Sequence, residues 1–291
     1  MPPGLFSGFM LDTWVEASVM AVVAGTVGFF VVLRGSTFAA HAIPQGAFAG
    51  AAGAALIGAD TLVGVGVFSL LGVLAIARWG RTGRHDVVVA LSLVTLLGIG
   101  SLFLSMSTEY AEQTFSLLFG EPLAVSSADL LPTAVLGAAC VILVAVLYRA
   151  LLLSSVAPEL AAAKGIRPER IELWFLLAVG AVTIMALPVV GALLVFSLMI
   201  GPPAAARFFT DHPGRAMAVS GGLALLTVWA AIVASFWSNW PIGFFVGTAA
   251  VVWYAVGRAM AVLTTRRSPR RRVPFGVAGG EDLSVTGALS A

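Results

Sequence analysis

Residues 34–53 read RGSTFAAHAIPQGAFAGAAG, a run of small apolar side chains with one histidine, His41, near its middle. Of the 291 residues of the chain, 59% are hydrophobic and only 10% are charged. A soluble domain carries about 25% charged residues, so this chain lacks the charge to cover its own surface. Its apolar runs are about 17–25 residues long, which is the length of a bilayer-spanning helix. The sequence therefore predicts an all-α polytopic membrane protein.

The composition and motifs also exclude several classes of function. The sequence pI is about 9.1, but the arginines lie between apolar runs and in one tail, where they set membrane orientation, so no nucleic-acid partner is expected. The only cysteine, Cys140, leaves no intrachain disulfide and no cysteine-cluster metal site. The sequence contains no phosphate-binding loop and no catalytic motif. We expect a protein that is not an enzyme and holds no cofactor, with any ATP hydrolysis on a partner chain.

The basic residues predict the topology. Arg34 and the arginine-rich loop at 78–85 lie on the same side of the membrane, two crossings apart. By the positive-inside rule this side is cytoplasmic, which places the N-terminus outside the cell. We expect residues 1–264 to form one transmembrane domain and the basic segment 265–291 to be a disordered cytoplasmic tail.

A cytoplasmic tail requires an odd number of crossings, and this bears on the apolar region 174–209. As one span, that region would leave the tail outside. Dividing it near Pro188 gives about nine crossings, and we expect eight or nine helices with a broken or re-entrant segment near Pro188–Pro203. Helices of this kind are tolerated where they line a cavity. Pro188, Gly191 and Pro202 are the candidate residues of a broken helix or gate; the alternative is a proline-kinked helix and a span miscounted elsewhere.

Two shorter stretches do not read as spans. Residues 115–130, which contain Gly120, are too interrupted to cross and should pack at the outer interface or partly re-enter. Pro158–Arg170 has the character of a soluble helix, because Pro158 suits a first helical position and Gly165 a C-terminal cap. We expect a short cytoplasmic helix there, although an ordinary connector would read similarly.

His41 is the candidate functional residue, because an ionisable side chain within the bilayer is costly unless it faces protein or water. Thr37, His41 and Gln45 are spaced by four residues and share one helix face. Neutral imidazole suits zinc, manganese and other transition metals. The alternative is a histidine that holds two helices together. Met185, Ser197 and Met199 could face the same cavity or simply pack.

Three stretches carry a resemblance to a known family, the permease subunits of the zinc- and manganese-type ABC importers (ABC-3 family). Arg34-Gly35 followed by His41 and Gly46 resembles the R-G…H-x4-G pattern of that family. The segment VAPELAAAKGI resembles its cytoplasmic segment. The stretch VVGALLVFSLMIGPPAAARFF resembles its G-x-L-L…P-A-x-x-A signature. The matching residues of the last two stretches are Glu159, Ala162, Gly165, Gly191, Leu193, Leu194, Pro202 and Ala206. The likeness covers about residues 15–262.

The resemblance implies a mechanism and a set of partners. Two permease copies would pair around a central path in the cell membrane. Two ATP-binding subunits would dock on the coupling segment with Glu159, Ala162 and Gly165. An extracellular solute-binding protein would deliver the ion, and the helix with His41 would supply the translocation site.

Two departures from the family pattern bear on the cargo. Thr37 stands where the family has an aspartate, and Gln45 stands where it has a proline. Without that carboxylate the site loses a hard anionic ligand, which favours zinc slightly over manganese. The expected function is transport of a divalent transition metal. The alternatives are the same architecture with a metal chelate as cargo, a secondary transporter that uses His41 as a proton relay, and a membrane-embedded enzyme.

Overall fold

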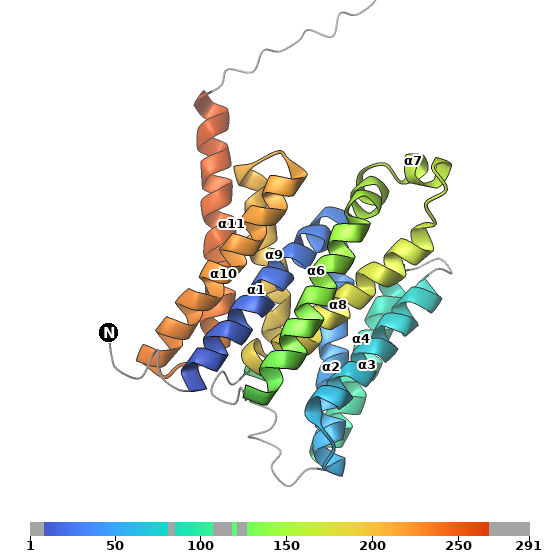
Figure 1. The fold of residues 1–291 in the computed structure, drawn as a ribbon, viewed down its shortest axis with the longest axis vertical. Coiled ribbons are helices and arrows are strands. Elements are labelled where there is room, and N and C mark those ends of the chain that lie inside the picture. Colours follow the sequence, from blue (N-terminus) through green and yellow to red (C-terminus); the bar gives the residue numbers. More distant parts are fainter. Residues whose placement is uncertain (1–8, 81–84, 107–117, 121–126, 268–291) are drawn as a thin grey trace, which may run out of the picture.

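The computed structural model describes residues 9–80, 85–106, 118–120 and 127–267, and the long elements in these ranges are all α-helices (Figure 1). The helices are α1 (Phe9–Arg34), α2 (Thr37–Ile57), α3 (Thr61–Trp79), α4 (His85–Ser105), α6 (Ser127–Val156), α7 (Pro158–Ala163), α8 (Pro168–Val190), α9 (Ala192–Phe209), α10 (Pro213–Ser238) and α11 (Ile242–Arg267). The predicted tail at 265–291 lies outside the described residues from 268 onward. The all-α membrane class is confirmed.

Within the described ranges, seven helices are long and apolar enough to cross a membrane. This number is below the predicted eight or nine, and the difference lies in α2 and α9. The apolar part of α9, Leu194–Phe209, is shorter than the others. Most residues of α2 are buried inside the protein. A helix surrounded by other helices need not be as apolar as one that faces lipid, because its neighbours cover its polar groups.

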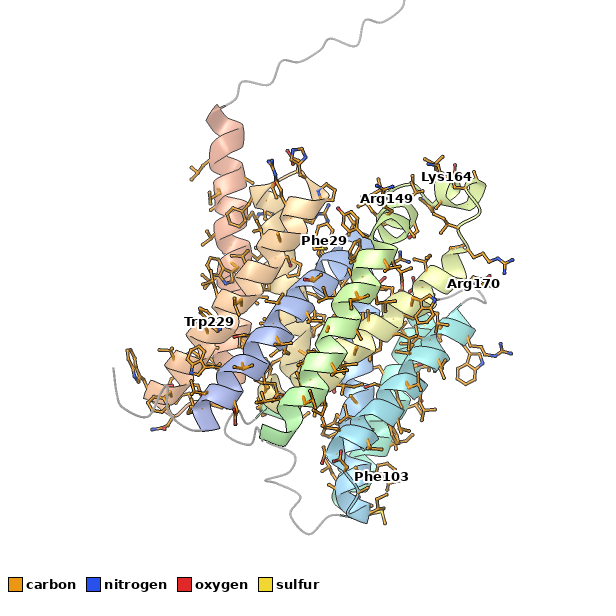
Figure 2. All side chains as sticks on the ribbon, in the orientation of Figure 1. Phe29, Phe103, Arg149, Lys164, Arg170 and Trp229 are labelled. Carbon is orange, nitrogen blue, oxygen red and sulfur yellow. The ribbon has the colours of Figure 1, made fainter. Side chains whose placement is uncertain are left out.

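The helices place the basic segments at one end of the bundle. Figure 1 shows α7, the end of α1 at Arg34 and the end of α11 at this end, which we call the α7 end. Figure 2 shows Arg149, Lys164 and Arg170 there as well. The N-terminal end of α1 lies at the opposite end of the bundle. The grouping agrees with a chain whose basic segments share one side of a membrane.

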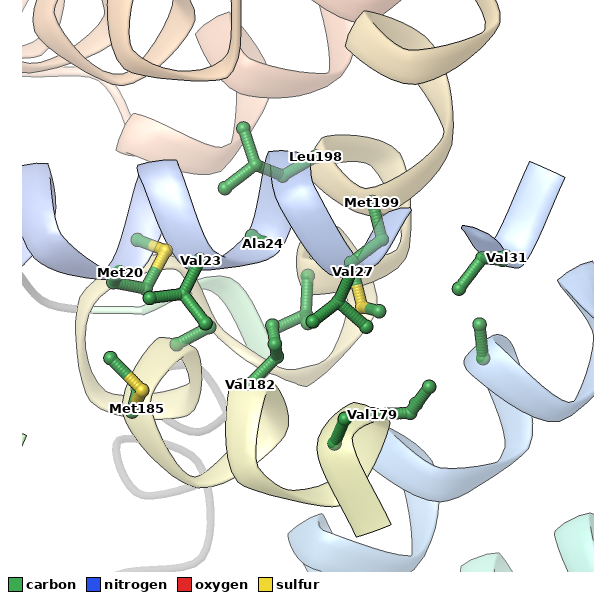
Figure 3. Packing of buried hydrophobic residues seen from close by; sticks show 14 of the residues in the cluster. Met20, Val23, Ala24, Val27, Val31, Val179, Val182, Met185, Leu198 and Met199 are labelled. Atoms are coloured by element: carbon green, nitrogen blue, oxygen red, sulfur yellow. The ribbon is translucent and has the colours of Figure 1, made fainter. Parts of the chain in front are cut away.

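The core forms where α1, α8 and α9 meet. Figure 3 shows Val23 and Val27 of α1 facing Val182 of α8, with Leu198 and Met199 of α9 beside them. All five side chains are buried. The core also contains a hydrogen bond, in which the hydroxyl of Ser220 donates to the backbone oxygen of Gly25 at 2.6 Å. These contacts fix α9 between α1 and the helices that follow it.

Small residues allow α2 to lie close to α3. A Cβ at Gly50 would overlap the carbonyl oxygen of Gly64, and a Cβ at Gly64 would overlap that of Gly50. The two helix backbones can approach this closely only because both residues lack side chains. The turn between them is well defined, since the carboxylate of Asp60 accepts a hydrogen bond from the backbone nitrogen of Val63 at 3.1 Å. The half of α2 that leads into α3 therefore packs closely against that helix.

The chain breaks between α8 and α9 at Gly191, which has φ 81° and ψ 158°. The break lies within the predicted Pro188–Pro203 region, but at Gly191 rather than at a proline. Pro188 lies inside α8 and Pro202 inside α9. The two parts of the divided region are unequal, because α8 has 23 residues and membrane length whereas the apolar part of α9 is shorter. Pro188 removes one backbone hydrogen bond near the end of α8, so a kink there displaces only the two helical residues that follow it.

The described part of the interrupted segment, Leu118–Gly120, lies against this break. A Cβ at Gly191 would overlap the backbone of Gly120 and Leu118, and one at Gly120 would overlap the backbone of Val189 and Val190. Backbone therefore packs directly on backbone at the end of the bundle opposite α7. The residues on either side of this short piece lie outside the described ranges.

Candidate metal site

His41 opens on a small cavity between α2 and α9. The cavity has a volume of about 210 Å³ and is lined by Thr37, Phe38, His41 and Phe196. The imidazole ring meets the ring of Phe196 edge-on, with centroids 4.8 Å apart and an interplanar angle of 67°. Thr37 and His41 are one helical turn apart, about 6 Å along the axis. The structure therefore brings a hydroxyl and an imidazole to the same space.

The imidazole has free capacity to bind a ligand. Its Nδ1 atom is buried and has no hydrogen-bond partner among the described residues. A buried polar atom left without a partner costs about 1–3 kcal/mol. The histidine is thus not a satisfied core residue in this conformation, because one of its ring nitrogens is enclosed without a partner.

Gln45 lies one turn further along α2 but does not line the cavity. Its side chain is 3% exposed, and its Nε2 atom is also buried without a partner among the described residues. The predicted stripe therefore splits into two parts. Thr37 and His41 reach the cavity, and Gln45 is enclosed beyond it.

The structure identifies two cavity residues that the sequence did not, Phe38 and Phe196. Phe196 of α9 forms the wall opposite His41. Met185 and Met199, which could have faced the same cavity, are buried in the core at 2% and 0% exposure (Figure 3). The packing of the helices decides which face of α9 lies against α2. A phenylalanine in an apolar helix does not by itself indicate that it lines a cavity.

A second polar cluster lies at the α7 end of the bundle. Arg34 donates from Nη1 to the hydroxyl of Ser154 at 2.8 Å and forms an ion pair from Nη2 to Oε2 of Glu172 at 2.5 Å. Its guanidinium carbon lies 5.1 Å from the ring centroid of Phe175. A cavity of about 420 Å³ adjoins this cluster. The sequence marked Arg34 as an orientation signal and as part of the family motif, but it did not indicate these contacts.

The predicted coupling residues lie on and just after α7. Glu159 and Ala162 are exposed on this six-residue helix, which begins with Pro158. Gly165 follows with φ 77°, and its backbone nitrogen donates to Ala162 at 2.9 Å. A left-handed residue at this place is the usual end of a helix. The expected short helix is therefore present, with its polar face open.

A buried carboxylate inside the bundle was also missed. Glu16 lies within α1 and is 2% exposed. The hydroxyl of Thr133 on α6 donates to its Oε1 atom at 3.2 Å. The two residues are far apart in sequence, so no local pattern could have paired them.

Membrane-length helices packed around a helix that carries an unpaired histidine have the arrangement of a membrane transport protein. The comparisons agree with this class. The family model of the ABC 3 transport family matches residues 7–261. The chain therefore belongs to that family, and the predicted role of a transport permease in a cell membrane is confirmed.

Individual relatives are similar at lower identity. The manganese transport system membrane protein MntC of Listeria innocua is 27% identical over 206 residues, 70% of this chain and 73% of that protein. The manganese import system permease protein ScaB of Streptococcus parasanguinis is 27% identical over 220 residues, 75% of this chain and 78% of that protein. The solved structure of PsaBC from Streptococcus pneumoniae in complex with Fab has a TM-score of 0.81 at 23% identity, over 91% of this chain and 98% of that chain. This last likeness supports the fold.

Proposed function

We propose that this chain is the permease subunit of an ATP-driven importer for a divalent transition metal, with His41 and Thr37 in the translocation site. The observation that carries the proposal is the His41 cavity, where a buried imidazole nitrogen is left unpaired beside a hydroxyl. An intramembrane histidine that faces a cavity is a functional site by default, because its burial is otherwise unfavourable. Imidazole is the common protein ligand of zinc and also binds manganese and iron.

The proposed orientation places the α7 end in the cytoplasm and the N-terminus outside. It rests on the basic residues gathered at that end, among them Arg149, Lys164 and Arg170 (Figure 2). An ATP-binding subunit then docks on α7, whose Glu159 is exposed. The opposite end, where Leu118–Gly120 packs on the α8–α9 break, receives the ion from an extracellular solute-binding protein. Pro188 and Gly191 flank the gate at this end of the path, whereas Pro202 lies inside α9, about 16 Å further along its axis at 1.5 Å per residue.

A second permease copy completes the metal site in this proposal. Within the described residues, no group of three or more histidine, cysteine or acidic side chains is placed to hold a metal. Zinc commonly takes four ligands, and the cavity offers one imidazole and one hydroxyl. Two copies related by a two-fold axis would present two histidines and two threonines, which is a plausible coordination shell for an ion in transit.

We propose a bare ion rather than a chelate, because the cavity offers single ligand atoms from His41 and Thr37 and the two relatives described above are named for manganese. Between metals, the absence of a carboxylate at position 37 favours zinc, whereas the two relatives described above are named for manganese. We therefore propose zinc or manganese as the cargo.

Metal uptake into reconstituted vesicles tests the function. The chain is purified with its ATP-binding subunit and reconstituted into vesicles. Uptake of ⁶⁵Zn²⁺ and ⁵⁴Mn²⁺ is then followed with and without ATP supplied to the ATP-binding subunit. We expect uptake that requires ATP and the partner subunit. Uptake by the permease alone, driven by a proton gradient, would instead establish the secondary transporter that uses His41 as a proton relay.

Replacing Thr37 with aspartate should change the preference between metals. Thr37→Asp adds a carboxylate one helical turn from His41, which is a harder ligand than imidazole and suits manganese. We expect the ratio of manganese uptake to zinc uptake to rise about tenfold, because about 1.4 kcal/mol of differential binding gives this factor. Thr37→Asn is the matched control, since asparagine has the shape of aspartate without its charge. An unchanged ratio in Thr37→Asp would remove Thr37 from the site.

Reversing the charge of Glu159 should weaken the attachment of the ATP-binding subunit. Glu159→Lys changes an exposed side chain on α7, so the fold should be unaffected. We expect the yield of co-purified ATP-binding subunit to fall about tenfold, since reversing a charge at an interface costs more than a kcal/mol. Asp211→Lys is the control, because Asp211 is exposed in the turn before α10. Equal yields for both variants would place the docking surface elsewhere.

A further inference from the structure

Arg34 is a buried charged residue with three simultaneous contacts. Its side chain is 11% exposed, although it is the last residue of α1. It binds Ser154 and Glu172 through two different nitrogens, and its guanidinium lies over the ring of Phe175. A residue that served only as an orientation signal would point into water. An arginine that is buried, ion-paired and stacked is instead held in one geometry.

The partners of Arg34 lie on both sides of α7. Ser154 is near the end of α6, which is the helix that leads into α7. Glu172 is in the second turn of α8, which is the helix that leaves α7. The guanidinium therefore bridges α6 and α8, the two helices that precede and follow α7 in the chain. A displacement of α7 relative to the bundle must move Ser154 or Glu172, or break one of these contacts.

Arg34 is also joined rigidly to the helix that carries His41. Only two residues separate α1 from α2, and Gly35 has φ 70°. The backbone nitrogen of Ser36 donates to the oxygen of Val31 at 3.1 Å, and that of Gly35 donates to Val32 at 3.4 Å. This is the doubly hydrogen-bonded left-handed turn that closes helices firmly. The turn leads directly into α2, with His41 in its second turn.

These two connections define a mechanical path. One end is α7, where the proposed ATP-binding subunit docks, and the other is α2, which holds the proposed metal site. The path runs from α6 and α8 through the guanidinium to the α1–α2 turn. Apart from this turn, α1 and α2 share few contacts, whereas α8 also packs directly against α2. The Arg34 cluster with the α1–α2 turn is therefore a second connection between α8 and α2, and it is the one that also includes α6.

We propose that Arg34 is a positioning residue that couples the movement of α7 to α2, so that ATP hydrolysis on the partner subunit changes the setting of His41. The proposal rests on the proposed function. Coupling between distant sites needs an element that both sites bias, and the three-way cluster of Arg34, Ser154 and Glu172 is such an element. The adjoining cavity of about 420 Å³ gives the guanidinium room to change partners.

The test measures the number of ions moved per ATP hydrolysed in vesicles that hold the full complex. The variants are Arg34→Met, Glu172→Gln and the double variant, and the substrates are ⁶⁵Zn²⁺ and ⁵⁴Mn²⁺. Methionine keeps the unbranched stem without the charge, and glutamine keeps the shape of glutamate. We expect each single variant to lower the ratio about tenfold, with ATP hydrolysis retained. The double variant should be no worse than the singles, because the two residues act as a unit.

Matched controls separate this role from general effects. Ser154→Ala removes the acceptor of Arg34 and should lower the ratio, whereas Ser155→Ala removes a hydroxyl that bonds only to its own helix at Leu151 and should not. Arg149→Met removes an exposed arginine at the same end of the bundle and should leave the ratio unchanged. The dissociation constant for the metal should stay within about twofold in every variant, since none of these residues lines the His41 cavity. Should Arg34→Met fail to fold, Glu172→Gln and Ser154→Ala test the same cluster.

The outcomes are distinct. A ratio equal to that of the unmodified protein in Glu172→Gln and Ser154→Ala overturns the proposal. A parallel loss of transport and ATP hydrolysis also overturns it, because that would mark a general defect. A double variant whose ratio falls by the product of the two single-variant losses overturns it too, because the residues would then act independently. Failure of the unmodified complex to move either metal would overturn the proposed function itself, and is recognised before any variant is compared.

Discussion

Replacing His41 with alanine is expected to abolish metal uptake while leaving the protein folded. The variant removes the imidazole that lines the cavity with Thr37 and Phe196. We expect the initial rate of zinc or manganese uptake to fall at least about 100-fold, which corresponds to about 2.8 kcal/mol of lost interaction with the ion. The effect on stability should be small, because the lost ring contact with Phe196 is offset by removal of a buried unpaired nitrogen.

A second substitution separates metal binding from packing. His41→Phe keeps an aromatic ring against Phe196 but has no nitrogen, so it preserves the contact between α2 and α9 and removes the ligand. We expect it to be as inactive as His41→Ala. His212→Ala is the control, since His212 is exposed in the turn before α10. Normal uptake by His41→Phe would show that the histidine only packs, and would remove the central residue of the proposed site.

The boundaries of the helices could be predicted where local chemistry sets them. The turn between α2 (37–57) and α3 (61–79) is an example. Between them, Gly58 adopts the left-handed conformation and Asp60 caps the next helix, and both residue types announce a turn in the sequence. The end of α7 at Gly165 was predictable for the same reason.

The sequence narrowed the break between α8 and α9 to a few residues without deciding among them. Pro188, Gly191 and Pro202 were the candidates, and prolines are the usual breakers. The break falls at Gly191, whose backbone conformation is open almost only to glycine. Pro188 and Pro202 both lie inside helices, so residue type alone does not decide where a helix ends.

Contacts between residues far apart in the chain could not be predicted from the sequence. The bond between Arg34 and Glu172 joins residues that are 138 positions apart, and that between Thr133 and Glu16 joins residues 117 apart. Periodicity reports which face of a helix is apolar, but not which neighbour it meets. The sequence therefore indicated His41 as the candidate ligand but not the aromatic wall of Phe196 opposite it.

The α8–α9 break leads to the second large effect, a loss of stability on replacing Gly191 with alanine. The φ of 81° with ψ of 158° costs a residue with a side chain about 1–3 kcal/mol. A methyl group would in addition overlap the backbone of Leu118 and Gly120, which cannot move as a side chain can. We expect a total loss of about 3 kcal/mol or more, which lowers the Tm by about 6–12 °C for a chain of this size.

Thermal unfolding of the detergent-solubilised protein measures this loss, with Gly222→Ala as the matched control. Gly222 is exposed inside α10, and a Cβ there meets nothing within 4 Å. Alanine is the better helix former by up to about 1 kcal/mol, so the control should keep or raise the Tm. A Tm for Gly191→Ala equal to that of the control would mean that Leu118–Gly120 does not press on the break. The contact between Leu118–Gly120 and the α8–α9 break would then be absent, because a methyl group at position 191 fits only where these two segments are apart.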